Sequence, residues 1–267
     1  MTMINRDPLS SPARRILGAI RSTVSLGITR QEIWFENDFA SSHADIVFVH
    51  HSLRPIDSMW NTPFKTILVD LTRGEDVLWK NLKKDTRNSV RRAEKDGVNV
   101  VHYASCTAQQ LEDFARTYRE LEIRKGLTPL DLKRLARLNR EKILALSIAT
   151  RRDGRPLSWH AYIVKGAHAR LMNSVQHLME LASSEERSFV GRAHRLHIWR
   201  DIQTFQKHGR SIYDLGGYHD GDDPIQHSIG RFKEEFGGTT IPCYSAIIPM
   251  TWRGHIALRL RYLLSRQ

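Results

Sequence analysis

The sequence contains only two cysteines, Cys106 and Cys243, and they lie far apart. Two isolated cysteines make no disulfide framework, and neither belongs to the paired CxxC spacing that is typical of a zinc site. We therefore expect both thiols to be reduced and buried, as in proteins of a reducing compartment, and neither to act as a nucleophile.

The sequence also lacks a long apolar run. None approaches the roughly 18 residues that a membrane-spanning helix requires. The apolar patch at 16–20 is short, lies between arginines and has no convincing cleavage site, which argues against a signal peptide. These absences predict a cytoplasmic protein, with at most peripheral contact at the inner face of the membrane.

Acidic residues are in the minority, with 29 Asp and Glu against 41 Lys and Arg, a formal net charge of +12 and a pI near 10. This imbalance predicts attraction to polyanions such as nucleic acid, nucleotide phosphates or an anionic lipid surface. The length of 267 residues, 40% of them apolar, suits one large domain or one domain with a smaller companion.

The hydrophobic pattern predicts an α+β protein with a mostly antiparallel sheet and flanking helices. β-branched runs between turn residues indicate strands, and apolar residues at helical spacing indicate helices. We expect one continuous basic helix over 76–96, and a hairpin around Asp153-Gly154. The other expected strands are 44–50, 66–70, 98–103, 143–150, 157–164, 169–176, 211–215 and 240–248; the other expected helices are 107–125, 130–141, 188–208, 224–236 and 252–264.

This order divides the chain into four parts. Residues 1–30 are predicted to form a tail and a basic amphipathic helix over 13–26. Residues 31–104 form an abbreviated subdomain that carries the basic helix, 105–250 form a complete α+β domain, and 251–267 form a basic C-terminal helix. The two terminal helices either pack on the core, which we prefer, or lie on an anionic membrane.

Two neighbouring segments are the best candidates for a site: YDLGGY at 213–218 and IGRFKEEFGG at 229–238. A strand runs into the pair Gly216-Gly217, which allows a close approach of the backbone to a ligand. Asp223 as N-cap and Pro224 at the first helical position then predict a helix that carries Lys233 near its end. The pattern alone is equally compatible with a glycine corner and a lysine that is favoured by the helix dipole.

These segments resemble the YDFGG and RFKExFGG signature of the Fem peptidyltransferases, which add amino acids to peptidoglycan precursors. The segment LWKNLKKDTRNSVRRAEK at 78–95 is similar to a basic helix of the same family, and GRAH at 191–194 with HIWRDI at 197–202 is similar to single-domain relatives. Three ordered motifs over about 65–248 are more specific than any one of them. The resemblance implies a GNAT-like (acyl-CoA N-acyltransferase) fold, with one complete domain and a remnant of the first.

The resemblance also implies roles for individual residues. Lys233 would stabilise the oxyanion or the ester leaving group, and Phe232 would line the acceptor channel. Candidate bases are Asp214, His197 and His219. The residues expected to bind substrate are Arg124, Arg192, His194, Gly216, Gly217, Tyr218, His219 and Arg231.

The donor is either acyl-CoA or aminoacyl-tRNA, used as a co-substrate, with no tightly bound cofactor. A CoA-binding loop would fall at 188–193, where Ser188 replaces the usual basic or amide residue. The cations Lys80, Lys84, Arg87 and Arg91 recur at steps of 4, 3 and 4 and form one stripe that could follow a phosphate backbone. An ordinary solvated helix face explains the same stripe.

Two other classes of function fit parts of the sequence. His194, His197 and His219 suggest a metal hydrolase, but no HExxH motif or cysteine partner is present, so we predict no metal. A non-catalytic RNA-binding module would use the basic helix and leave the glycine motifs unexplained. We therefore predict a transferase of acyl or aminoacyl groups to an amine of a cell-envelope precursor, such as an amino sugar or a peptidoglycan peptide, without a stable protein partner.

Overall fold

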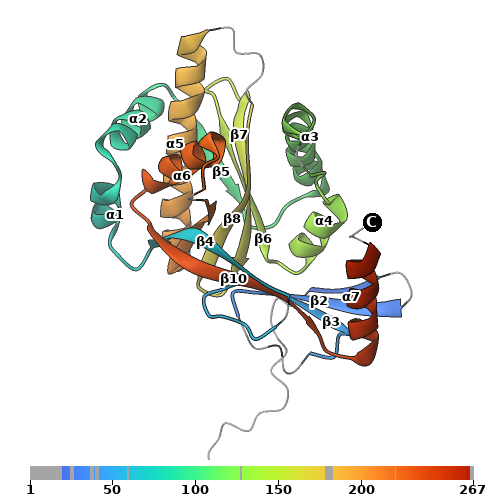
Figure 1. The fold of residues 1–267 in the computed structure, drawn as a ribbon. Helices are drawn as coiled ribbons and strands as arrows, with labels where there is room; N and C mark the ends of the chain where they lie inside the picture. Colours follow the sequence, from blue (N-terminus) through green and yellow to red (C-terminus); the bar gives the residue numbers. More distant parts are fainter. Residues whose placement is uncertain are drawn as a thin grey trace, which may run out of the picture.

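The computed structural model describes residues 20–24, 27–36, 39, 42–58, 60–126, 128–177, 183–219 and 221–264 (Figure 1). Its strands are β1 (Ile20–Val24), β2 (Ile28–Trp34), β3 (Ile46–Ser52), β4 (Trp60–Asp70), β5 (Asn99–Tyr103), β6 (Leu144–Thr150), β7 (Pro156–Lys165), β8 (His168–Gln176), β9 (Ile212–Tyr218) and β10 (Thr239–Pro249). Its helices are α1 (Glu75–Asn81), α2 (Lys84–Lys95), α3 (Ala108–Lys125), α4 (Leu132–Arg140), α5 (Ser184–Lys207), α6 (Pro224–Glu234) and α7 (Trp252–Leu264).

All strands of the described residues belong to one sheet, in the order β1-β2-β3-β10-β4-β9-β8-β7-β6-β5. The pairs β2–β3 and β8–β9 are parallel, and the other neighbours are antiparallel. The predicted α+β fold with a mostly antiparallel sheet is therefore confirmed. The sheet does not break near residue 104, since β4 of the N-terminal part pairs with both β9 and β10.

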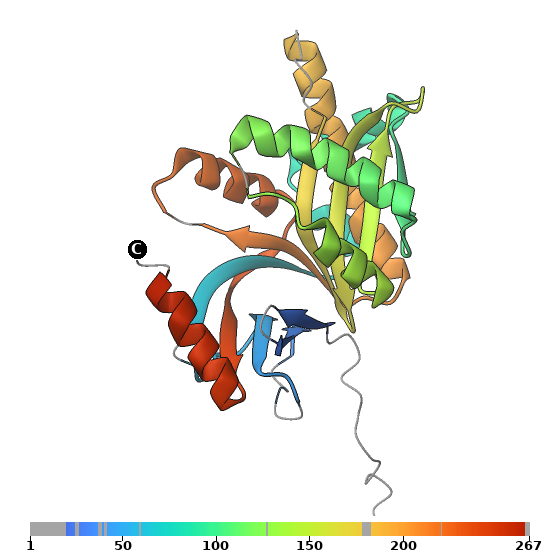
Figure 2. The same cartoon turned by 90° about the vertical axis from the view of Figure 1, so that its right-hand side faces the viewer.

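Helices cover both faces of the half of the sheet that runs from β9 to β5. Figure 1 shows α1, α2, α5 and α6 on one side and α3 and α4 on the other, and Figure 2 shows α3 and α4 in front of the strands. Strand β7 serves both layers because its side chains alternate. Trp159, Ala161 and Ile163 pack in the cluster with α3 and α4, while Tyr162 packs in the cluster with α2 and α5.

The basic segment at 76–96 is two helices, and the prediction of one continuous helix is wrong. Helix α1 ends at Asn81, and Leu82 and Lys83 have extended backbone angles before α2 begins. The break buries Leu82 and lets the Lys83 amide donate to the carbonyl of Glu235 at 2.9 Å. A contact with a residue distant in sequence thus overrides local helical periodicity.

The N-terminal and C-terminal predictions had different outcomes. Residues 20–24 of the predicted helix 13–26 form β1. This strand pairs with β2, which was not predicted from the sequence. Residues 13–19, 25 and 26 lie outside the described residues.

Helix α7 confirms the predicted C-terminal helix. It packs Leu258 into the molecule but leaves Trp252, Ile256, Leu260 and Leu263 exposed. Among the described helices, none has the length and apolarity that crossing a bilayer requires.

Both cysteines are free and buried, as predicted. Burial raises the pKa of Cys106 and of Cys243 to about 11. Both groups are therefore protonated thiols at neutral pH, which is the unreactive form.

Candidate active site

The strand end of β9 and the last turn of α6 meet at one side of a cavity of about 420 Å³. The Lys233 ammonium donates to the carbonyl of Gly217 at 2.5 Å. Gly216 adopts a φ of +84°, and a Cβ there would lie 3.2 Å from the carbonyl oxygen of Leu171 and 3.7 Å from the Lys233 Nζ. The positive φ and the close Leu171 carbonyl therefore require a glycine at 216, and this turn presents the Gly217 carbonyl to the lysine. The residues that line the cavity are Leu171, Ser174, Gln176, Gly191, His194, Arg195, Ile198, Leu215, Ser228, Ile229, Phe232 and Lys233.

Helix α6 begins as the sequence predicts. The Asp223 side chain accepts from the amide of Ile225, and Pro224 occupies the first turn. Tyr218 fixes the helix against β9, because its hydroxyl donates to the Glu234 carboxylate at 2.9 Å and its ring fills the space beside Gly230. This packing positions Lys233 on the turn that faces the strand end.

The environment of Lys233 favours loss of its proton. Burial, with a smaller contribution from the nearby positive charge of Arg170, lowers the pKa of Lys233 from 10.5 to about 8, and the negative charge of Asp214 opposes this shift. A partly desolvated cation interacts more strongly with negative charge than one in bulk water does. The ammonium is thus suited to stabilise an oxyanion that develops in the cavity.

Asp214 is turned away from the cavity. Its Oδ1 accepts from the Thr66 hydroxyl at 2.5 Å and from the Gly216 amide at 2.7 Å, and its Oδ2 lies 3.4 Å from the Arg170 Nε. The carboxylate therefore fixes the glycine turn and compensates the buried Arg170 charge. Its geometry supports a positioning role rather than contact with a reacting amine.

Phe232 and His194 form an aromatic wall of the cavity. Their rings stack with centroids 5.0 Å apart and an interplanar angle of 7°. The guanidinium of Arg195 lies over the Phe232 ring, 5.1 Å from its centroid, and makes a two-point ion pair with Glu235 at 2.8 and 3.0 Å. This pair joins α5 to the end of α6 and so holds the two sides of the cavity together.

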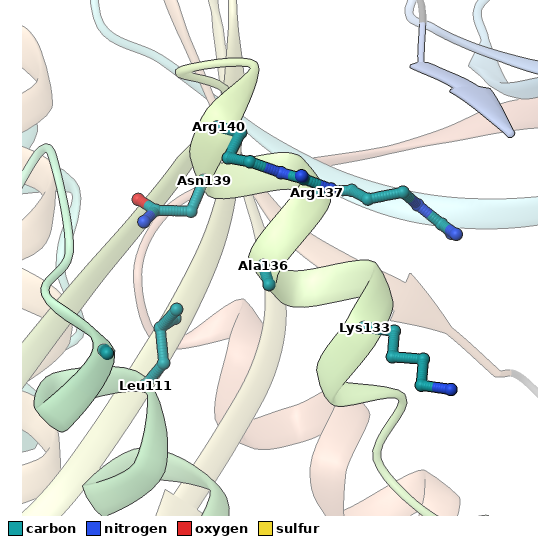
Figure 3. A pocket seen from close by; sticks show the side chains of 7 residues that line it. Leu111, Lys133, Ala136, Arg137, Asn139 and Arg140 are labelled. Atoms are coloured by element: carbon teal, nitrogen blue, oxygen red, sulfur yellow. The ribbon is translucent and has the colours of Figure 1, made fainter.

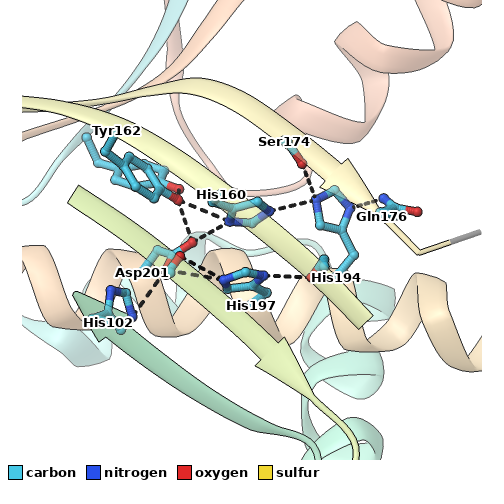
Figure 4. A network of polar contacts seen from close by, with 11 residues as sticks. His102, His160, Tyr162, Ser174, Gln176, His194, His197 and Asp201 are labelled. Atoms are coloured by element: carbon cyan, nitrogen blue, oxygen red, sulfur yellow. Dashed lines mark hydrogen bonds and ion pairs between the residues drawn. The ribbon is translucent and has the colours of Figure 1, made fainter. Parts of the chain in front are cut away.

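Behind this wall, a network of buried polar side chains connects α5 to the sheet (Figure 4). His194 Nε2 lies 3.1 Å from His160 Nε2, and His160 Nδ1 lies 2.6 Å from Asp201 Oδ2. Tyr162 donates to the same Asp201 oxygen and lies 2.9 Å from the hydroxyl of Tyr213. The cavity wall is thereby linked to a carboxylate with no exposed surface.

His197 lies inside this network and does not line the cavity. Its Nδ1 is 2.7 Å from the Ser158 hydroxyl, its Nε2 is 2.8 Å from the Ser147 hydroxyl, and its ring stacks on His160 at 3.7 Å. Burial lowers the pKa of His197 well below its usual value. A neutral ring with both nitrogens hydrogen-bonded and no exposure has no direct route to a substrate.

Three of these groups, His160, His197 and Asp201, lie close enough together to hold a metal ion. Of the histidines that suggested a metal from sequence, only His197 belongs to this group. Both nitrogens of His197 already have hydroxyl partners, and His160 uses Nδ1 on Asp201. The donor set is thus satisfied within the protein, and the absence of a metal stays a prediction.

The remaining predicted binding residues lie in different places. Gly216, Gly217 and Tyr218 are on β9 beside Lys233, and His219 follows them on the surface. Arg231 is exposed on α6, and Arg192 pairs with Asp96 of α2 at 3.2 Å. Arg124 belongs to α3, on the opposite face of the sheet from α6 (Figure 1), and its side chain lies outside the described residues.

The basic stripe spans the break between α1 and α2. Lys80, Lys84 and Arg91 are exposed, and Arg91 lies over the Trp79 ring at 5.2 Å. Arg87 is half-buried and donates to the backbone carbonyls of Lys80 and Leu82. It therefore caps the end of α1, which leaves the other three cations to meet a ligand.

The segment where a CoA-binding loop would fall is helical. Residues 188–193 lie inside α5, whose backbone groups are used within the helix. The helix begins at Ser184, after Ser183 as its N-cap, and its first turn carries Glu185 and Glu186. Glu186 forms an ion pair with Arg151. Glu185 adds a negative charge to the first turn, which opposes the binding of a pyrophosphate there.

The sequence analysis missed His160, Asp201, Ser174 and Arg195. A signal was present, because His194, His197 and Asp201 recur at steps of 3 and 4 on α5, and Ser158, His160 and Tyr162 alternate along β7. Each pattern places polar groups on a face that the hydrophobic pattern predicts to be buried. Only their pairing across the two elements reveals the network.

A second cavity of about 580 Å³ lies between α3 and α4, on the other face of the sheet (Figure 3). Lys133, Arg137 and Arg140 line it together with Leu111, but Figure 3 shows these cations extending from α4 away from Leu111. Among its lining residues, which are all described, there is no carboxylate, histidine, cysteine or hydroxyl that could take part in proton transfer. The cavity beside Lys233 is the better candidate for chemistry.

Comparison with known proteins supports the fold. No family model and no curated protein matches this chain by sequence. The structure is similar to FemX, with a TM-score of 0.60, 13% identity, and coverage of 86% of this chain and 84% of that one. It is also similar to L-PGS from Bacillus licheniformis, with a TM-score of 0.53, 12% identity, and coverage of 92% and 89%. This chain therefore has the Fem-like fold that its motifs predicted.

Proposed function

We propose that this protein transfers an aminoacyl group from a charged tRNA to an amine of a cell-envelope precursor. The observation that carries the proposal is the ammonium of Lys233, held against Gly217 at the wall of a partly enclosed cavity. The RFKEEFGG and YDLGGY segments meet there, and the fold is shared with FemX and L-PGS.

The reaction is an aminolysis of an ester. The amine nitrogen attacks the ester carbonyl, the new C–N bond forms, and the C–O bond to the tRNA ribose breaks. Negative charge appears first on the carbonyl oxygen and then on the leaving oxygen. Lys233 stabilises this charge, while the stacked rings of Phe232 and His194 exclude water from one side of the cavity.

Two observations favour tRNA over CoA as the donor. Helix α5 presents Glu185 and Glu186 where a CoA pyrophosphate would need a free helix start. Lys80, Lys84 and Arg91 are exposed cations on α1 and α2, and the chain carries a net charge of +12. These groups can contact a phosphate backbone without adding sequence specificity.

The test is a transfer assay with purified protein. Charged tRNA and acyl-CoA are supplied as donors in separate reactions, with amino-sugar nucleotides and muropeptides as acceptors. The products are identified by mass spectrometry. We expect transfer from charged tRNA, and a loss of about 10²- to 10³-fold in Lys233→Met, the usual effect of removing one oxyanion donor. Lys207→Met, which changes an exposed lysine of α5, serves as the matched control.

Three outcomes would contradict the proposal. Transfer from acyl-CoA alone would make the protein an acyl-CoA-dependent N-acyltransferase. Retention of charged tRNA without turnover would favour the RNA-binding module. Full activity of a folded Lys233→Met variant would show that the lysine has no role in the reaction.

A further inference from the structure

The histidine network connects the cavity to a buried acid in an unbroken series of short contacts. His194 lines the cavity and is 7% exposed, whereas His160 and Asp201 have no exposed surface. His160 stands between them, 3.1 Å from His194 and 2.6 Å from Asp201 (Figure 4). None of these contacts is needed to place Lys233, so the network calls for an explanation of its own.

The hydrogen-bond partners determine which nitrogens carry hydrogen. An ionised Asp201 only accepts, so His160 must donate from Nδ1 and Tyr162 from its hydroxyl. The His160 Nε2 is then an acceptor, and His194 donates to it from Nε2. The Ser174 hydroxyl oxygen lies 3.1 Å from the same His194 Nε2 and shares this hydrogen as a second acceptor. The His194 Nδ1 is left as an acceptor, which the side-chain amide of Gln176 meets at 2.6 Å.

We propose that His194, His160 and Asp201 form a proton relay that takes a proton from the amine substrate in the cavity to a buried carboxylate. This inference rests on the proposed function, because it supplies the base that the aminolysis requires. Three bases were suggested by sequence. Asp214 and His197 offer no comparable path from the cavity, and His219 is exposed beyond the end of β9 and is not among the residues that line the cavity.

The transfer balances at each step. The amine first takes the place of the Gln176 amide at His194 Nδ1. It then loses an N–H bond as His194 Nδ1 gains one, and Gln176 can afterwards turn its amide oxygen towards the new donor. His194 then loses the hydrogen on Nε2 to His160 Nε2, and His160 loses the hydrogen on Nδ1 to Asp201. Both histidines end neutral with exchanged tautomers, and the net result is a neutral amine and a protonated Asp201.

Electrostatics favour this direction. The reactants are an ammonium and a buried carboxylate, and the products are both neutral, so the transfer removes two charges from a poorly solvated site. Burial raises the pKa of Asp201 to about 6, against opposing effects of His102, Tyr162 and Ser147. The group is therefore ionised at neutral pH but closer in basicity to an amine than an exposed carboxylate is.

The histidines are suited to pass a proton on rather than keep it. Burial lowers the pKa of His160 to about 3 and that of His194 well below its usual value. The nearby charge of Arg195 adds to the lowering of the His194 pKa. An imidazolium is thus disfavoured at both positions. A concerted shift of hydrogens along the chain avoids it, as no ring has to carry a positive charge for long.

His102 provides the return path to solvent. Its Nε2 lies 3.1 Å from Asp201 Oδ1, and its side chain is 19% exposed on strand β5. Among the described residues, His102 Nε2 and Asp201 Oδ1 are two buried polar atoms without a well-aligned hydrogen bond. A small rotation of the His102 ring would let it take the proton from Asp201 and release it on the side away from the cavity.

The first measurement follows histidine tautomers by ¹⁵N NMR in the full-length protein from about pH 4.5 to about 8.5. We expect His160 and His194 to exchange tautomers together with a midpoint near pH 6. The exchange should vanish in Asp201→Asn and persist in His255→Gln, which alters an exposed histidine of α7. A single fixed tautomer for both rings in the wild-type protein would overturn the relay, and so would one stoichiometric zinc ion in the purified protein.

The second measurement compares two acceptors in the transfer assay: an ordinary amine, and hydroxylamine, which is already neutral at pH 7. Asp201→Asn should lose about 10²- to 10⁴-fold with the amine, the usual contribution of a general base. The loss should be at least about 10-fold smaller with hydroxylamine, after subtraction of the reaction without enzyme. Lys233→Met should lose equally with both.

The two proposals fail in different ways. Equal losses of Asp201→Asn with both acceptors would reduce Asp201 to a structural role and overturn the relay. An absence of transfer by the wild-type protein would overturn the proposed function, while the NMR titration would still decide whether the proton moves along the chain.

Discussion

Replacing Lys233 by methionine should stabilise the fold at neutral pH while it lowers transfer by about 10²- to 10³-fold. Holding the ammonium in its site lowers the pKa of Lys233 from 10.5 to about 8, chiefly through burial. Each pKa unit corresponds to about 1.4 kcal/mol, so the charged lysine destabilises the folded state by roughly 3 kcal/mol below pH 8. Methionine fills a similar volume without a charge.

Loss of the hydrogen bond to Gly217 offsets part of this gain. The carbonyl of Gly217 would lose the donor that lies 2.5 Å away, which costs about 1 to 2 kcal/mol. We therefore expect Lys233→Met to raise the free energy of unfolding by about 1 to 2 kcal/mol at pH 7.

The pH dependence distinguishes this cause from better packing. Between pH 8 and pH 10.5 the unfolded wild-type chain retains the Lys233 proton and the folded chain does not, so the stability of the wild type rises with pH in this window. The variant lacks this contribution, so its advantage should shrink and then reverse.

Urea unfolding of both proteins at pH 7, 8, 9 and 10 measures the effect, and Lys207→Met controls for the loss of a charge. Groups that titrate in both proteins cancel in the difference. A variant that is less stable than the wild type at pH 7, with a difference that does not change up to pH 10, would refute the reasoning.

Two further predictions concern the groups around the cavity. Because the pKa of Asp201 is raised from 3.8 to about 6, its contribution to the unfolding free energy should fall by roughly 3 kcal/mol as the pH rises through this window. The difference in urea stability between the wild type and Asp201→Asn should therefore change by that amount, because other groups cancel in the comparison. Gly230→Ala would place a Cβ 2.9 Å from the Tyr218 ring, which should cost about 1 to 3 kcal/mol despite the better helix propensity of alanine. Gly221→Ala, where a Cβ meets open space, should leave the thermal midpoint unchanged; equal midpoints for the two variants would contradict this packing.

The sequence by itself determined the elements whose signals are local. The Asp223-Pro224 start of α6 follows from capping, the turn at Gly216 from its positive φ, and the strands β6, β7 and β8 from short apolar runs between turn residues. These rules act over a few residues, so one chain suffices to read them. The Fem-like motifs lie on the same elements, which is why the fold could be predicted.

Tertiary structure decided whatever depends on a partner distant in the chain. The helix over 76–96 breaks at Leu82 because burial of that side chain and the contact of Lys83 with Glu235 outweigh helical periodicity. Residues 20–24 become a strand because β2 offers them a neighbour. Asp214 turns to Thr66 and Gly216, a choice that no spacing in the sequence encodes.

The relay shows the same division most clearly. The sequence places three polar groups on one face of α5 and three on one face of β7, and its hydrophobic pattern predicts both faces to be buried, but it does not show which groups pair. Burial becomes favourable only when His160 meets both His194 and Asp201 across the two elements, because each polar group then has a partner. Burying either set of polar groups without its partners would cost free energy, so only the tertiary structure, which brings the two sets together, determines this network.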